Sequence, residues 1–282
     1  IGSTTFLDQQ DTMRFPLYLT FVLSLLATGT ALLMKEVQTE EADTSAPEQN
    51  HSIIAATQKT IEAGIWILRT PFALAVILFG MTFDHVIRMM ITMTSQYYRL
   101  IDIPEAMFGI IGAAIAVLGL VAPKIAEKMA SSFSPSGNML IVSTLTITGF
   151  FGLVLFIPYY GVIPMAITFT GIIFTSFFAS HYLNQITPSH QRATVLSFKG
   201  MAFNLAYGTI GVLFAGLLQS MRKSVATEHP QELSEVAIES IAFKQAVGWF
   251  PWYTIITLVL IIIFCKFLLR GSTIYLKTEK NI

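Results

Sequence analysis

Three ionisable residues, Asp84, His85 and Arg88, interrupt an otherwise apolar stretch that runs from Pro71 to Ser95. The stretch is long enough to cross a lipid bilayer as a helix, which takes about 20 residues. A charged group at the bilayer centre costs about 2.5–3.5 kcal/mol on insertion scales, so membrane helices keep such groups where they face protein or water. Asp84 and Arg88 are one helical turn apart and can pair directly. The cluster therefore predicts a polar pathway through a membrane.

The same helix face carries further polar side chains. With helical spacing, one stripe holds Asp84, Arg88, Thr92 and Ser95, whereas His85 points about 100° away. In one interpretation the stripe lines an aqueous cavity, where Asp84 or His85 takes up a proton and Arg88 holds the carboxylate ionised or binds an anionic substrate. In the other, Asp84 and Arg88 form a structural ion pair and His85 is a packing residue. Both interpretations stay open.

A second polar group ends a later apolar stretch, residues 160–183. His181 and Tyr182 lie near its end, and Asn184 follows. We assign to a substrate or proton pathway Asp84, His85, Arg88, Thr92, His181 and Tyr182. In the next apolar stretch, Asn204 and Tyr207 suit interhelical hydrogen bonding as well as substrate contact.

The composition is that of an integral membrane protein. Hydrophobic residues make up 54% and charged residues 12% of the chain, and the mean hydropathy is +0.65, whereas a soluble domain has about 25% charged residues. The formal net charge is zero, so no nucleic-acid partner is expected. A single cysteine, Cys265, allows no intrachain disulfide and no cysteine-based metal motif. We expect no metal, no cofactor and no enzymatic activity, because no hydrolase, P-loop or dinucleotide motif occurs.

Seven apolar stretches have the length of a membrane span. They cover residues 14–34, 71–96, 104–123, 138–158, 160–183, 194–219 and 246–269. The predicted fold class is an all-α membrane protein with seven transmembrane helices. Between the first two, Ser52 to Arg69 predicts an amphipathic helix on the membrane surface, with candidate apolar positions at Ile53, Ile54, Ile61, Ile65 and Trp66. The connection over residues 220–245 predicts a short solvated helix.

The basic residues indicate an orientation. One set of loops carries Lys35, Lys59, Arg69, Lys124, Lys128, Arg192, Lys199, Lys266, Arg270, Lys277 and Lys280, and the other carries Arg14, Arg99, Arg222, Lys223 and Lys244. The larger set predicts the cytoplasmic side. We therefore expect a multi-pass protein of the inner (plasma) membrane with the long linker and the C-terminus in the cytoplasm. Close helix packing is predicted at Gly109, Gly112, Gly119, Gly200, Gly208, Gly211 and Gly216.

The connection after the fifth span reads Asn184-Gln-Ile-Thr-Pro-Ser-His-Gln-Arg192-Ala-Thr-Val-Leu-Ser197-Phe-Lys-Gly200. It resembles the loop between the tenth and eleventh helices of bacterial major facilitator superfamily transporters, which has an Asn-Arg pair, a turn containing Pro, and Arg-Ala-Thr-x-x-Ser. Here Gln185 stands where that pair has its Arg. The loop from Pro123 keeps only a faint echo of the basic, glycine-rich loop between helices eight and nine.

The resemblance implies four parts of the chain. Residues 1–34 would be the last helix of an N-terminal bundle, and residues 35–70 a cytoplasmic linker with the amphipathic helix. Residues 71–270 would form the C-terminal six-helix transmembrane bundle, and residues 271–282 a cytoplasmic tail. Because the chain starts with Ile and no signal peptide precedes the first span, we expect a fragment that lacks earlier helices.

The resemblance also implies a mechanism. Two six-helix bundles rock about a central site, with the second and fifth spans of this chain lining the cavity. Asn184 and Arg192 become gating candidates, although positive-inside topology explains Arg192 equally well. The expected function is secondary active transport of a small organic solute, with proton-coupled efflux as one form. The alternatives are proton-coupled uptake of a sugar, nucleoside or carboxylate, and a non-transporting seven-helix module. The implied partners are the solute, protons, the lipid bilayer and the missing N-terminal helices.

Overall fold

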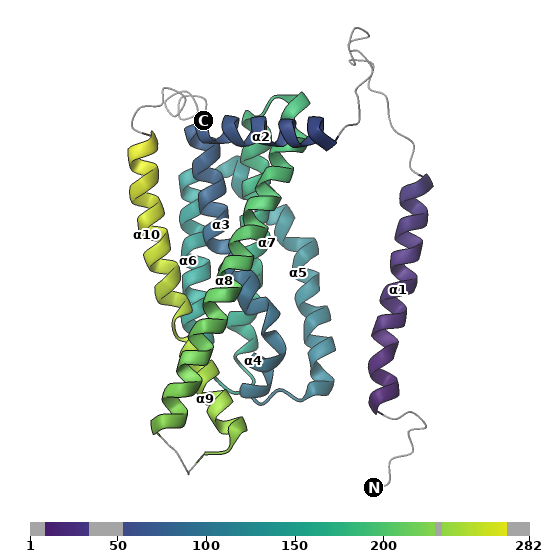
Figure 1. Cartoon of the computed structure of the whole chain (residues 1–282), viewed down its shortest axis with the longest axis vertical. Coiled ribbons are helices and arrows are strands. Elements are labelled where there is room, and N and C mark those ends of the chain that lie inside the picture. Colours follow the sequence, from purple (N-terminus) through teal and green to yellow (C-terminus); the bar gives the residue numbers. More distant parts are fainter. Residues whose placement is uncertain (1–8, 34–52, 229–232, 270–282) are drawn as a thin grey trace. The chain divides into compact units, whose positions relative to one another are not determined.

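A computed structural model describes residues 9–33, 53–228 and 233–269 (Figure 1). Within these residues every regular element is a helix. The chain divides into two compact units, Ile1–His51 and Ser52–Ile282, which are described separately.

The first unit contains α1 (Gln9–Leu33). Its described apolar part, Tyr18–Thr30, is shorter than a membrane span. The hydroxyls of Ser24 and Thr28 donate to backbone carbonyls one turn earlier in the same helix, which satisfies them without a partner helix. The predicted first span is therefore helical, but its role as a seventh crossing is not confirmed.

Six helices in the described residues are long and apolar enough to cross a membrane. They are α3 (Pro71–Thr92), α5 (Glu105–Ser132), α6 (Pro135–Val154), α7 (Val162–Ile186), α8 (Arg192–Glu228) and the segment in which α9 (Glu235–Val247) precedes α10 (Phe250–Leu269). Successive spans run in opposite directions (Figure 1). The chain is therefore an all-α, multi-pass membrane protein, as the composition predicted.

Local sequence signals account for several helix ends. Pro71 and Pro135 occupy the first turns of α3 and α6, where the missing N–H has no intrahelical partner to lose. The Ser134 hydroxyl accepts a hydrogen bond from the Gly137 N–H and caps α6. At the other end of α3 the helix breaks at Met93, and α4 (Thr94–Leu100) follows. The predicted span 71–96 is thus two helices, and Ser95 belongs to α4 rather than to the polar stripe.

The connection predicted over residues 220–245 is largely helical. α8 continues to Glu228, well past the predicted end of its span, and α9 follows. An ion pair joins them, with 2.5 Å between Arg222 Nη2 and Glu239 Oε1. Residues 229–232, which include Glu232 of the predicted solvated helix, lie outside the described residues.

The predicted amphipathic helix is present as α2 (Ile53–Arg69). It crosses the ends of α3 and α8 (Figure 1). Its buried positions are Ala63, Gly64 and Ile67, and a Cβ on Gly64 would lie 2.7 Å from the Phe198 ring, so only glycine allows this approach. Of the predicted apolar positions, Trp66 packs partly buried against the core, whereas Ile61 and Ile65 lie exposed together with Leu68. The side chains of Ile53 and Ile54 lie outside those described. An exposed apolar face is compatible with a helix that lies on a membrane surface.

The core surrounds α7, which packs against α3, α5 and α6. Close helix contacts occur at Gly149, where an added Cβ would lie 2.6 Å from Thr168 Oγ1, and at Gly171, 2.9 Å from Thr146 Oγ1. The close packing predicted at the α5 and α8 glycines is not found within the described residues. Nothing in the described part of the chain lies within 4 Å of a Cβ added at Gly109, Gly112, Gly119, Gly200, Gly208, Gly211 or Gly216. A glycine allows another helix to approach closely, but its presence does not indicate which face of its helix is packed.

Candidate functional site

The Asp84–Arg88 pair forms as the spacing predicted. Arg88 Nη2 lies 2.8 Å from Asp84 Oδ1 and 2.6 Å from Oδ2. The Asp84 side chain is only 5% exposed, whereas that of Arg88 is 32% exposed. Asp84 therefore depends on Arg88 for neutralisation, because a shielded charge without a partner is costly. Arg88 is thus the partner of both Asp84 oxygens.

Arg88 also ties α3 to α8. Its Nη1 donates to Asn204 Oδ1 over 2.7 Å, and its guanidinium carbon lies 5.2 Å from the centre of the Tyr207 ring. One turn further along α3, the Thr92 and Tyr207 hydroxyls are 2.8 Å apart. Asn204 and Tyr207 thus make interhelical hydrogen bonds. The predicted stripe on α3 is divided, because Asp84 and Arg88 face a cavity while Thr92 contacts α8.

The pair lies in the wall of an open cavity of about 720 Å³. Most of the lining comes from α7, which supplies the polar side chains of Ser176, Ser180, His181 and Asn184 and the apolar ones of Ile172, Ile173 and Phe177. Pro123 of α5 completes it. The volume falls within the range of about 300–1,000 Å³ that is typical of small-molecule sites. The structure therefore brings Asp84, Arg88, His181 and Asn184 together around one space.

Lys199 of α8 is a neighbour of this cavity. Its Nζ donates to Ser180 Oγ over 2.7 Å and lies 5.6 Å from the centre of the Phe203 ring. The Asp84 carboxylate attracts it electrostatically. Sequence reasoning counted Lys199 among the loop charges that set the orientation. The signal was available, because Lys199 lies inside the predicted span 194–219.

His181 presents a flat surface to the cavity. Its ring stacks on Phe177 with 5.6 Å between centroids and 13° between planes. Gln185 Nε2 donates to His181 Nε2 over 3.0 Å, which fixes the ring from the following turn. Gln185 therefore orients a side chain of the cavity wall.

Two predicted pathway residues lie elsewhere. His85 is buried against α10, where its Nδ1 contacts the Met81 carbonyl and its Nε2 lies 2.8 Å from the Tyr253 hydroxyl. In the neutral ring, Nδ1 therefore carries the hydrogen and Nε2 accepts from Tyr253. Tyr182 is buried in the core, where its hydroxyl accepts a hydrogen bond of 2.7 Å from Asn138 Nδ2. Neither lines the cavity.

Arg192 acts locally. Its Nε donates to the Thr187 carbonyl over 3.2 Å, across the short helix η1 (Ser189–Gln191) that joins α7 to α8. Within the described residues it forms no ion pair. The contact stabilises the turn between the two helices, and its role as a gate stays a prediction.

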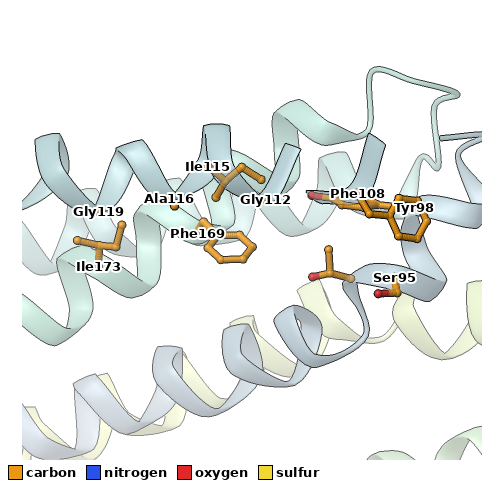
Figure 2. A pocket seen from close by; sticks show the side chains of 10 residues that line it. Ser95, Tyr98, Phe108, Gly112, Ile115, Ala116, Gly119, Phe169 and Ile173 are labelled. Atoms are coloured by element: carbon orange, nitrogen blue, oxygen red, sulfur yellow. The ribbon is translucent and has the colours of Figure 1, made fainter. Parts of the chain in front are cut away.

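A second cavity of about 330 Å³ lies between α4, α5 and α7 (Figure 2). Tyr98 and Phe108 lie side by side at one end, with 5.4 Å between their ring centroids. Phe169 and Ile173 form the α7 side (Figure 2). The hydroxyl of Thr94, one of its few polar side chains, donates to the Ile91 carbonyl. This cavity has no charged side chain in its lining.

Comparisons with known proteins provide no match from which a function could be inferred. No protein-family model, no curated protein and no solved structure matches the chain. In the described part of the chain no group of three His, Cys, Asp or Glu side chains could hold a metal ion. The features that bear on function are therefore the cavity and the Asp84–Arg88 pair in its wall.

Proposed function

We propose that the chain forms the solute-binding bundle of a secondary active transporter that moves a small organic solute by alternating access. The observation that carries this proposal is the Asp84–Arg88 pair, held at 2.6–2.8 Å in the wall of a cavity of about 720 Å³. The pair forms within α3, both of its residues line the cavity, and the Arg88 side chain is 32% exposed. The resemblance of the Asn184–Gly200 segment to major facilitator superfamily transporters supports the same function.

Asp84 is the residue to which we assign the coupling proton. Both of its oxygens contact Arg88 Nη2, and the side chain lies in the cavity wall, so a proton that reaches Asp84 from the cavity would compete directly with the ion pair. A proton on Asp84 would break the ion pair, while the hydrogen bond to Asn204 would still hold Arg88 against α8. His85 suits this role less well, because both of its ring nitrogens face other partners.

Proton-coupled efflux and proton-coupled uptake of a sugar, nucleoside or carboxylate both use a carboxylate that loads and releases a proton. We propose that the α2 end of the bundle faces the cytoplasmic side of the inner membrane, because α2 ends at Arg69, α8 begins at Arg192, and Lys124 lies in the second half of α5.

The test is transport by the complete protein in liposomes with an imposed pH gradient. A panel of sugars, nucleosides, carboxylates and organic amines is offered, and proton flux is followed with an internal pH-sensitive dye. We expect one class to drive proton movement, and Asp84→Asn to abolish that movement while the protein stays in the membrane. Glu105→Gln, which neutralises an exposed carboxylate outside the cavity, is the matched control.

Two results would count against the proposal. Undiminished proton-driven transport by Asp84→Asn would exclude the proton role of Asp84. Absence of transport for every solute, with a folded protein that faces the correct way, would favour the non-transporting module.

A further inference from the structure

We propose that the cavity binds an organic anion whose carboxylate contacts Lys199 and whose apolar part lies along α7. This inference rests on the proposed transport function and specifies its substrate class. Ser180, which lines the cavity, accepts a hydrogen bond of 2.7 Å from Lys199 Nζ, so the ammonium group lies within hydrogen-bond distance of a lining side chain.

The charges around the cavity leave a positive excess. Asp84 is neutralised by Arg88, whose Nη2 touches both carboxylate oxygens. Lys199 forms no ion pair with any described residue. An ammonium group has three N–H donors, and the hydrogen bond to Ser180 uses one of them. Two donors therefore remain for a ligand, and a carboxylate is the group that they bind most strongly.

The remaining lining suits the rest of such a molecule. The Asn184 side chain, with an amide donor, lies one turn beyond Ser180 on α7. Ile172, Ile173 and Phe177 form an apolar wall in the other direction along the same helix. Phe177 and His181 are nearly parallel, so they present flat rings to an aromatic or alicyclic ligand. A polar group at one end and an apolar wall at the other match an amphiphilic carboxylate.

An organic cation is the main alternative, since Asp84 could attract one. The geometry disfavours it, because the Asp84 side chain is 5% exposed and already paired, whereas Lys199 is not paired. A cation would also have to approach Arg88 and Lys199 on neighbouring helices, and like charges repel.

The experiment uses three sets of probes that share a skeleton and differ in charge. They are benzoate, benzamide and benzylamine; the 2-naphthyl carboxylate, amide and methylamine; and octanoate, octanamide and octylamine. Binding to the complete protein in lipid nanodiscs is measured by isothermal titration calorimetry, and the same probes are tested for counterflow in liposomes. We expect at least one carboxylate to bind more tightly than its neutral and cationic analogues.

Three variants connect binding to Lys199. Lys199→Met should weaken carboxylate binding about tenfold or more, since it removes a charge-assisted hydrogen bond. Lys199→Arg keeps the charge and should stay within about threefold of the parent protein. Lys128→Met, which removes an exposed lysine of α5 outside the cavity, should leave binding unchanged. The thermal midpoint of each variant without ligand shows that it is folded.

The outcomes separate this inference from the transport proposal. Preferred binding of an amine or an amide, failure of all nine probes to bind, or carboxylate binding that Lys199→Met does not weaken would each overturn the inference. Transport of an amine without carboxylate binding would support the proposed transport function and contradict the proposed anionic substrate. Carboxylate binding that depends on Lys199, without counterflow, would support the anion site and contradict transport.

Discussion

The two cavities of the bundle share Ile173 but differ in what their walls can bind. Both are lined by α5 and α7, which run parallel from the α4 end towards the α2 end (Figure 1). The larger has the Asp84–Arg88 pair and four polar side chains of α7 in its wall. The smaller has Tyr98, Phe108 and Phe169, and its glycines leave it open rather than filled. The presence of a cavity therefore does not distinguish the two sites. The charged side chains in the wall of the larger one do.

The break at Met93 accounts for much of this difference. α3 brings Asp84 and Arg88 to the larger cavity, whereas the smaller one meets α4, with Ser95 and Tyr98. The charged part of the predicted stripe precedes the break and lines the larger cavity, whereas Ser95, which follows it, lines the smaller one.

The largest effect is expected when the pair in the polar cavity is broken. Arg88→Met leaves the shielded Asp84 carboxylate unpaired, and we expect the free energy of unfolding to fall by about 3–5 kcal/mol. Adding Asp84→Asn should recover at least half of the loss, since no uncompensated charge then remains. Denaturant unfolding of the protein in detergent measures both.

Glu105→Gln is the control for that prediction. It breaks the Arg99–Glu105 pair, whose side chains are 59% and 62% exposed, and exposed pairs contribute under about 1 kcal/mol. Equal losses for the two single variants would mean that the shielding of Asp84 has no energetic consequence.

A bulky residue in either cavity tests which one carries the solute. Ser176→Leu narrows the polar cavity and should lower the initial transport rate about tenfold or more, which is about 1.4 kcal/mol. Gly112→Leu enters the open space of the apolar cavity and should change the rate less than about twofold. Rates are compared at equal amounts of folded protein. The reverse result would move the pathway to the apolar cavity.

The smallest effect is expected at His85. Tyr253→Phe removes the hydroxyl that lies 2.8 Å from His85 Nε2, and one lost hydrogen bond costs about 1 kcal/mol of stability. Transport should stay within about twofold, because His85 faces α10 and not the cavity. Loss of transport by a stable Tyr253→Phe protein would instead support a role of His85 in the substrate or proton pathway.

Several features could be predicted because they depend on local spacing. Asp84 and Arg88 had to share a face once the helix formed, and α2 and the six long helices follow from runs of apolar residues. The direction of His85, away from the stripe, also followed from the helical period. Such inferences need only the geometry of one helix.

The features that could not be predicted depend on contacts between residues of different helices. Tyr182 and Asn184 are two residues apart near the end of α7, yet one is buried against Asn138 and the other lines the cavity. The sequence placed Lys199 among the cytoplasmic loop charges, whereas in the structure it donates a hydrogen bond to Ser180 of α7. The α5 and α8 glycines looked like packing positions, and no described helix contacts them.

The sequence by itself determined the membrane class, the positions of the long helices and the Asp84–Arg88 pair, because hydropathy and helical spacing act over a few neighbouring residues. Only the tertiary structure decided that Arg88 contacts Asn204, that His85 contacts Tyr253 of α10, and that Lys199 donates to Ser180 in the wall of the polar cavity. The physical reason is that each of these contacts joins residues on different helices. Their distance is set by how the helices pack, and helical spacing within one segment carries no information about it.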